Sequence, residues 1–198
     1  MCSMKISRGN RMAFSKAIIF VLIMLSSFTV HSYEIAGIQI PDNTMVAGQT
    51  LQLNGAGIRS KFFFKIYVGA LYLSKSANTS MAVYQQKGPK SILMSFLYDE
   101  VPADKLISAW NEGFEENNDS KELSSLSERI KQFNALFVTA HKGDTIRLDM
   151  IPGKGTLVWF GDKLQATVAG DDFALALQKI WLGEKPADDD LKEGMLNQ

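Results

Sequence analysis

Strand-like and helix-like segments occupy separate blocks of this chain. Runs rich in β-branched and aromatic residues are typical of strands, and they occur at 34–41, 50–57, 62–73, 91–98, 144–151, 155–160 and 163–168. The last three are joined by short glycine-containing connections, which suit tight hairpins. Strands at both ends of the chain, with helices between and after them, favour an α+β domain that has a mainly antiparallel sheet and a layer of helices on one face.

Two helices are predicted between the groups of strands. The segment that begins at Pro102 repeats apolar residues at helical spacing, which indicates one buried face; these residues are Leu106, Ile107, Trp110 and Phe114. A similar stripe starts near Ser120 and contains Leu123, Leu126, Ile130, Phe133 and Phe137. Further helices are expected at 173–183 and 187–196. Narrow stripes of this kind are typical of core-facing seams, and we assign no cofactor to them.

The N-terminal segment has the layout of a secretory signal peptide. Four basic residues, Lys5, Arg8, Arg11 and Lys16, precede an apolar stretch at 17–30. This order is typical of a signal peptide, and the stretch is shorter than the roughly 20 residues of a membrane-spanning helix. We expect residues 1–32 to be removed, leaving one domain at 33–198 that is periplasmic or secreted and has no stable membrane span. An uncleaved signal anchor is the alternative.

Charge and cysteine content exclude several classes of function. The chain has equal numbers of acidic and basic residues, 21 of each, so removal of four basic residues leaves a net charge of −4. A mildly acidic domain without a basic block is a poor candidate for nucleic-acid binding. Cys2 is the only cysteine, and residues 33–198 therefore have no disulfide, thiol nucleophile or thiolate metal site.

Histidine and glycine patterns also argue against a cofactor or a metal. His141 is the only histidine after the signal segment, and we expect it at the end of the second helix, where the helix dipole favours it. Gly55-Ala56-Gly57 resembles the start of a dinucleotide fingerprint, but Ser60 stands where the third glycine belongs, and a strand is predicted where a helix is needed. We expect no metal, no nucleotide and no other cofactor.

Arg59 is the candidate site residue that the residues alone suggest. It could form an ordinary surface ion pair, or it could lie at the rim of an apolar cavity under the sheet. In the second case its guanidinium would hold a carboxylate or enolate oxygen through two parallel N–H bonds. Tyr67 could donate to the same oxygen. Four bulky aromatic residues are nearby, which predicts that the remainder of the ligand is hydrophobic; they are Phe62, Phe63, Phe64 and Tyr72.

Three stretches of the chain resemble the bacterial branch of the chalcone isomerase-like family. They are GAGIRSKFFFKIYVGALYL at 55–73, WNEGF at 110–114, and GDKLQATVAGDDFALALQKIWLGEKPADDDLKEGML at 161–196. The resemblance spans nearly all of residues 33–198. The combination of G-x-G-x-R before an aromatic strand with I-W-L-G-x-x-P near the end is more specific than either motif alone.

The resemblance implies an open-faced β-sandwich: a large antiparallel sheet, helices over one face and a ligand cleft between them. The family contains plant isomerases, which close a chalcone to a flavanone without a cofactor, and non-catalytic relatives that bind fatty acids. Both use an arginine in the place of Arg59. In the isomerases it stabilises a developing enolate; in the fatty-acid binders it grips the carboxylate beside a tyrosine, whose place Tyr67 takes here.

The chain departs from the isomerases at two further positions. These enzymes carry a lysine in the following strand and a tyrosine at the start of the next helix, whereas here the neighbourhood contains apolar residues and Pro102, with Lys90 and Tyr98 nearby. We therefore predict an exported protein that binds a small hydrophobic or amphipathic anion, such as a fatty acid, through Arg59 and Tyr67. The alternatives are a cofactor-independent isomerase or lyase that uses the same two residues, and an accessory protein that acts through an unidentified partner.

Overall fold

A computed structural model describes Met1 and residues 32–198 of the chain. The predicted signal peptide lies outside the described residues except at its two ends, and its cleavage stays a prediction. None of the helices in the described part of the chain is long and apolar enough to cross a membrane.

A seven-stranded antiparallel sheet forms the centre of the fold, in the order β11-β10-β9-β6-β5-β4-β3. Its strands are β3 (Asn43–Val46), β4 (Gln49–Lys61), β5 (Phe64–Leu73), β6 (Lys90–Phe96), β9 (Thr145–Ile151), β10 (Gly155–Phe160) and β11 (Lys163–Val168). Two small antiparallel pairs accompany it: β1 (Ser32–Ile35) with β2 (Ile38–Pro41), and β7 (Glu100–Val101) with β8 (Ala140–His141).

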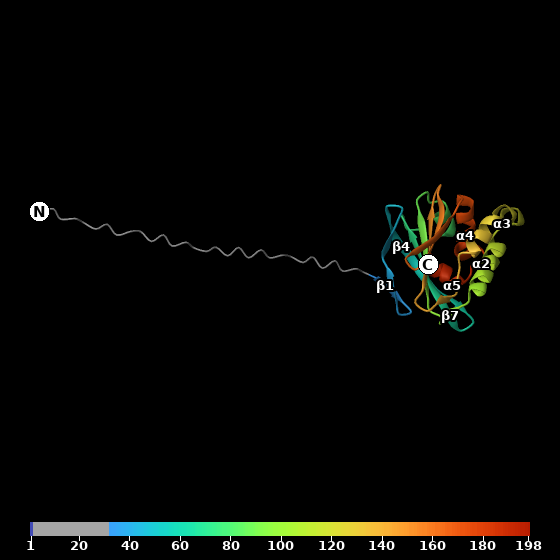
Figure 1. Ribbon diagram of the computed structural model, residues 1–198, viewed down its shortest axis with the longest axis horizontal. Coiled ribbons are helices and arrows are strands. Elements are labelled where there is room, and N and C mark those ends of the chain that lie inside the picture. Colours follow the sequence, from blue (N-terminus) through green and yellow to red (C-terminus); the bar gives the residue numbers. More distant parts are fainter. Residues whose placement is uncertain (2–31) are drawn as a thin grey trace.

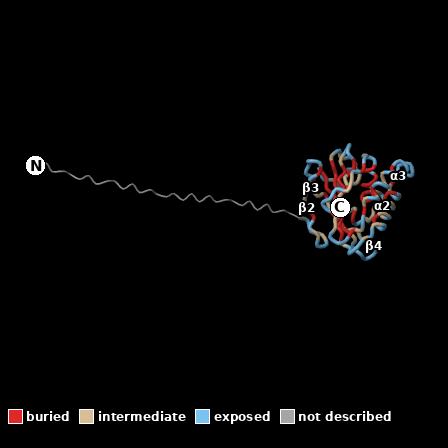
Figure 2. The backbone as a smooth tube through the Cα atoms, in the orientation of Figure 1, coloured by how far each residue is buried: buried red, intermediate tan, exposed pale blue. Residues whose placement is uncertain are grey.

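Helices cover one face of this sheet, as predicted (Figure 1). They are α1 (Ser80–Tyr84), α2 (Ala103–Asn117), α3 (Ser120–Asn134), α4 (Asp171–Leu182) and α5 (Asp189–Met195). The main hydrophobic cluster lies between these helices and the sheet, and Figure 2 shows buried residues gathered there. This arrangement confirms the α+β, open-faced sandwich expected from the sequence.

A smaller hydrophobic cluster lies on the other face of the sheet. Ile40 of β2 packs there with Leu51 of β4 and Tyr72 of β5, and the β1–β2 pair lies on this side in Figure 1. Both clusters belong wholly to residues 32–198, which also contain every helix and strand described. The described residues 32–198 therefore carry a hydrophobic core.

Helix α3 begins at a capping box. The Asp119 carboxylate accepts hydrogen bonds from the backbone N–H groups of Lys121 and Glu122 at 2.9 and 2.8 Å, and the Glu122 carboxylate accepts one from the N–H of Asp119 at 3.1 Å. These bonds satisfy donors that a helix start leaves free. The apolar stripe of α3 is thereby directed at the core, where Leu126 and Phe133 are buried.

The predicted boundary between the second and third strands is wrong. We expected strands at 50–57 and 62–73, but β4 continues to Lys61 and turns back through Phe62 and Phe63. Phe62 adopts a positive φ of 57°, a conformation that turns normally assign to Gly, Asn or Asp. The turn thus lacks the Gly, Asn or Asp residues from which a turn is normally predicted.

Glycines in β4 allow α5 to approach the strand closely. A Cβ atom at Gly57 would lie 2.8 Å from Cα of Leu191, and one at Gly55 would collide with the carbonyl oxygen of Gly194. Glycine in a strand often marks such a close approach of another backbone. Gly55-Ala56-Gly57 therefore serves helix packing in this fold, and β4 continues through it where a nucleotide-binding loop would need a helix.

Candidate functional site

Arg59 and Tyr67 are brought together across the β4–β5 pair. They are register partners in the ladder, and the guanidinium carbon of Arg59 lies 5.8 Å from the centre of the Tyr67 ring. The register shifts between Arg59 and Ser60. Irregularities of this kind re-aim side chains and are frequent beside functional sites. The two residues predicted from the sequence thus lie in contact on one side of the sheet.

The Tyr67 hydroxyl is held by a tryptophan from the helical layer. Trp181 of α4 donates a hydrogen bond from Nε1 to Tyr67 Oη at 2.9 Å, and both residues are buried. Burial raises the pKa of Tyr67; the nearby Arg59 guanidinium and the Trp181 hydrogen bond act in the opposite direction, and Asp188 adds to the increase. The phenol is therefore neutral near pH 7, and it accepts from Trp181 while its own proton stays available to a ligand.

Two buried nitrogen donors beside Tyr67 have no hydrogen-bond acceptor. They are Nε of Arg59 and Nε1 of Trp110, which belongs to α2. Arg59 also forms no salt bridge with any residue that the structure describes. Buried donors are normally paired, because an unpaired one costs about 1–3 kcal/mol. Because both residues also line one cavity, they indicate a place for an acceptor that the protein itself does not supply.

These donors line one small cavity between β4–β5 and the helices. Its volume is about 10 Å³, and its walls are formed by Arg59, Tyr67, Met94, Leu106, Ala109, Trp110, Ile180 and Ala187. A space of this size holds about one water molecule. Apart from the three polar groups its lining is apolar, and no carboxylate or histidine is among the lining residues. The chemistry of the site therefore suits an anionic head with an apolar remainder.

The aromatic surroundings predicted for the ligand are wrong. Phe62 and Phe63 are 86% and 99% exposed at the hairpin turn, and Phe64 is 56% exposed. Tyr72 is buried on the opposite face of the sheet, where its hydroxyl donates to the carbonyl of Pro41 at 2.9 Å. Trp110 of α2 lines the cavity instead, and Trp181 of α4 contacts Tyr67 through the hydrogen bond described above. The motifs WNEGF and IWLG contain them, and this was the signal that sequence reasoning left unused.

The other residues considered from the sequence lie elsewhere. Tyr98 is part-exposed and packs edge-on against Phe64, with ring centres 5.5 Å apart. His141 was expected at the end of a helix, but it belongs to β8 and is exposed, 3.9 Å from a Glu100 oxygen. It lies there because α3 already ends at Asn134. Neither residue lines the cavity of Arg59.

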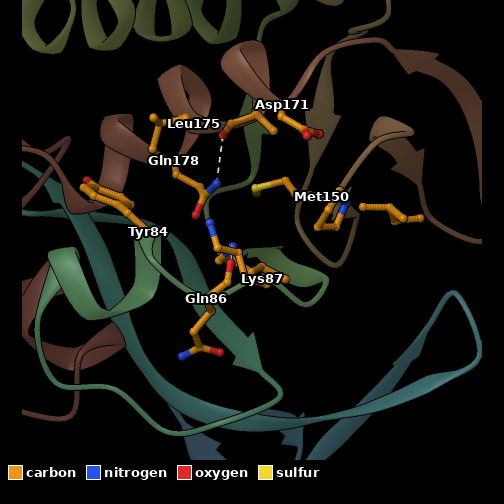
Figure 3. A pocket seen from close by; sticks show the side chains of 11 residues that line it. Tyr84, Gln86, Lys87, Met150, Asp171, Leu175 and Gln178 are labelled. Carbon is orange, nitrogen blue, oxygen red and sulfur yellow. Dashed lines mark hydrogen bonds between the residues drawn. The ribbon is translucent and has the colours of Figure 1, made fainter.

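Lys90 lines a separate cavity of about 240 Å³ between α4 and the start of β6 (Figure 3). Its ammonium group donates to the carbonyl of Gln86 at 2.8 Å, and burial lowers its pKa, although Asp171 opposes this. Gln178 points into the same cavity and donates to the Ala174 carbonyl at 3.0 Å. The cavity has a mixed polar and apolar lining and is open to water, and it shares no lining residue with the Arg59 cavity.

Comparisons with known proteins agree with this architecture. The family described as chalcone isomerase-like matches residues 32–197. The crystal structure of a fatty-acid-binding protein from Arabidopsis thaliana is similar, with a TM-score of 0.62 and 15% sequence identity over 84% of this chain and 96% of that chain. No curated protein sequence matches. At 15% identity the structural likeness establishes the shared fold.

Proposed function

The chain belongs to the chalcone isomerase-like family, and from this premise we propose that it binds a small hydrophobic anion, such as a fatty acid, between its sheet and its helices. Arg59 and Tyr67 hold the acidic head, and Trp110 donates a third hydrogen bond. The observation that carries the proposal is the unpaired, buried Nε of Arg59 in a largely apolar cavity that Trp110, whose Nε1 is also unpaired, lines as well.

A carboxylate fits these three groups better than a neutral ligand does. It offers two oxygens with about four acceptor positions, and hydrogen bonds between ionised partners are roughly twice as strong as neutral ones. The Tyr67 phenol, kept neutral by its raised pKa, donates without adding negative charge. The name of the Arabidopsis protein supports a fatty acid as the ligand class.

The cavity must widen for an acyl chain to enter. Sites for such ligands have volumes of about 300–1,000 Å³, far above the volume of about 10 Å³ seen here. Leu106 and Trp110 of α2 form one wall and Ile180 of α4 the other. Met94 adds a flexible side chain that adapts readily to new neighbours. We infer that the acyl chain separates α2 from the sheet and takes the place of these side-chain contacts.

An isomerase or lyase that stabilises an enolate is the second candidate. The donors around Arg59 could stabilise an oxyanion as well as a carboxylate. However, Tyr67 is the only cavity-lining residue that could lose a proton in mildly alkaline solution, and burial raises its pKa. No cavity-lining residue could act as a general base near pH 7. Binding is therefore the function that the site supports better.

We further propose that the domain acts after export, in the periplasm or outside the cell. The support is the order of charged and apolar residues in the first 32 positions. N-terminal sequencing of the protein from a cell envelope fraction tests this proposal. Recovery of the protein only from the cytosolic fraction, with chains that still begin at Met1, would contradict it.

The ligand proposal is tested by extraction and by titration. Purified residues 32–198 are extracted with organic solvent, and the extract is analysed by mass spectrometry; a fatty acid or related acyl anion is expected. Titration of the delipidated protein with laurate should then show binding that Arg59→Ala weakens at least tenfold. Arg129→Ala is the matched control, since Arg129 pairs with Asp172 on the surface. Equal affinity of the parent and Arg59→Ala would overturn the proposal.

A further inference from the structure

The turn between β4 and β5 exposes three consecutive phenylalanines. Residues 61–65, Lys-Phe-Phe-Phe-Lys, are all exposed, and we call them the aromatic tip. The exposed fractions of Phe62, Phe63 and Phe64 are 86%, 99% and 56%. Large apolar side chains gathered at one exposed place mark interaction sites or membrane contacts. The tip is thus a candidate interaction site on the described surface.

The fold itself gains nothing from phenylalanine at the first two of these positions. Phe62 has a φ of 57°, a region that disfavours bulky residues. Glycine or asparagine would suit the turn better, and neither Phe62 nor Phe63 packs against the core clusters. Local rules broken without a structural gain are expected at functional positions.

Charge decides which partner suits the aromatic tip. Lys61 and Lys65 flank the phenylalanines, and residues 61–65 contain no acidic side chain. The nearest acids belong to neighbouring elements: Asp188 accepts from the backbone of Ser60, and Asp99 and Glu100 follow Tyr98, whose ring packs on Phe64. Contact between the tips of two copies would bring four lysines together, which like charges disfavour. An anionic lipid surface instead suits both the apolar phenylalanines and the two flanking lysines.

We propose that the aromatic tip inserts into the surface of a lipid bilayer that contains anionic headgroups. Phe62 and Phe63 enter the boundary between headgroups and acyl chains, as apolar side chains of interfacial segments do. The stems of Lys61 and Lys65 extend so that their ammonium groups reach the lipid phosphates. A narrow, projecting hairpin suits insertion into a deformable lipid surface, and Figure 1 places it at the edge of the molecule beside β7.

Docking in this way places the Arg59 cavity close to the membrane. Arg59 lies in β4 three residues before Phe62 of the turn, a distance of about 10 Å at the usual rise of a strand. A fatty acid that leaves the bilayer would thus travel only a short distance to Arg59. This last step rests on the proposed function, whereas docking itself does not: it would hold even if Arg59 bound no acyl anion.

Vesicle flotation of residues 32–198 tests the docking. We expect the protein to float with vesicles of phosphatidylcholine and phosphatidylglycerol. The variant Phe62→Asn/Phe63→Ser should lower the bound fraction at least tenfold while its thermal unfolding temperature stays equal or rises. Met45→Ser/Met81→Ser is the matched control, because these methionines are 68% and 61% exposed away from the tip. This control should float like the parent.

Salt and lysine variants separate the two parts of the motif. Lys61→Glu/Lys65→Glu should reduce flotation several-fold with anionic vesicles, and about 1 M salt should do the same for the parent by shortening the Debye length to about 3 Å. Flotation of the aromatic-tip variant at the level of the parent would overturn the proposal. So would a tip-dependent dimer in sedimentation experiments without any vesicle binding. Loss of laurate affinity in Arg59→Ala leaves flotation unchanged, and this separates docking from ligand binding.

Discussion

Arg59 and Tyr67 face each other across adjacent strands, with the guanidinium carbon 5.8 Å from the ring centre, while Trp181 binds the Tyr67 hydroxyl from the helical layer. A cation and a neutral phenol are therefore fixed side by side at the sheet–helix boundary. The arrangement costs stability, since two buried donors in the same cavity lack acceptors. Several consequences of this cost can be measured.

Replacing Arg59 with methionine should make the ligand-free protein more stable. The change removes a buried, unpaired N–H group, which costs about 1–3 kcal/mol, and it forfeits a cation–π contact of about 0.5–1 kcal/mol. We expect the free energy of unfolding in urea to rise by up to about 2.5 kcal/mol, with laurate binding lost. Arg129→Met, which breaks the pair with Asp172, should not be stabilising. A clear loss of stability in Arg59→Met would show that Arg59 has a structural role instead.

Tyr67→Phe should destabilise the protein. It leaves Nε1 of Trp181 buried without an acceptor, which costs about 1–3 kcal/mol in the free energy of unfolding. Tyr84→Phe is the contrasting variant, because the buried hydroxyl of Tyr84 has no partner and its removal should be neutral or stabilising. Urea unfolding of both variants checks this pair. Equal losses would contradict the assigned hydrogen bond.

Gly57→Ala should be strongly destabilising although it adds a single methyl group. The new Cβ would lie 2.8 Å from Cα of Leu191 in α5, and backbone atoms cannot move aside as a side chain can. A loss of about 1–3 kcal/mol is expected from overpacking of this kind. At Gly88 the nearest atom would be the rotatable Ser74 Oγ at 3.2 Å, and Gly88→Ala should cost much less. Thermal or urea unfolding distinguishes the two variants.

Stability should fall in alkaline solution above about pH 10, the ordinary pKa of tyrosine. Burial raises the pKa of Tyr84 to about 12 and raises that of Tyr67 as well. Between the unfolded and folded pKa values the unfolded chain loses the proton first, and rising pH therefore favours unfolding. The stabilisation from the neutral phenols is complete below about pH 10 and is lost as pH rises through the folded values. Tyr84→Phe should make this decline shallower; an unchanged slope would contradict the assignment.

Periodicity was sufficient to predict the layers of the fold but not its turns. Residue spacing within a single helix or strand shows which of its faces is buried. The apolar stripes of α2 and α3 and the alternation in the strands could therefore be read from short stretches of the sequence. The turn at Phe62 carries no glycine, proline or asparagine, and its position follows from the pairing of β4 with β5 rather than from local preference. The strand boundary could not be placed correctly for this reason.

The candidate site was predictable only in part. Arg59 and Tyr67 are close in sequence, and the resemblance to a family identified both. Trp110 lines the same cavity and Trp181 holds the Tyr67 hydroxyl, from helices that follow much later in the chain. Their contribution depends on how α2 and α4 pack on the sheet, which residue spacing does not specify.

The close packing of α5 on β4 also determines at which stage of folding the Arg59 cavity can form. Asn54 donates to the Met195 carbonyl and the Ser60 N–H donates to Asp188, contacts that join residues 141 and 128 positions apart. The early strands are thus completed by the last helix, and contacts of such sequence separation form late in folding. A chain still held by the ribosome has no finished cavity. If the protein is exported unfolded, it leaves its compartment of synthesis empty and can acquire a ligand only at its destination.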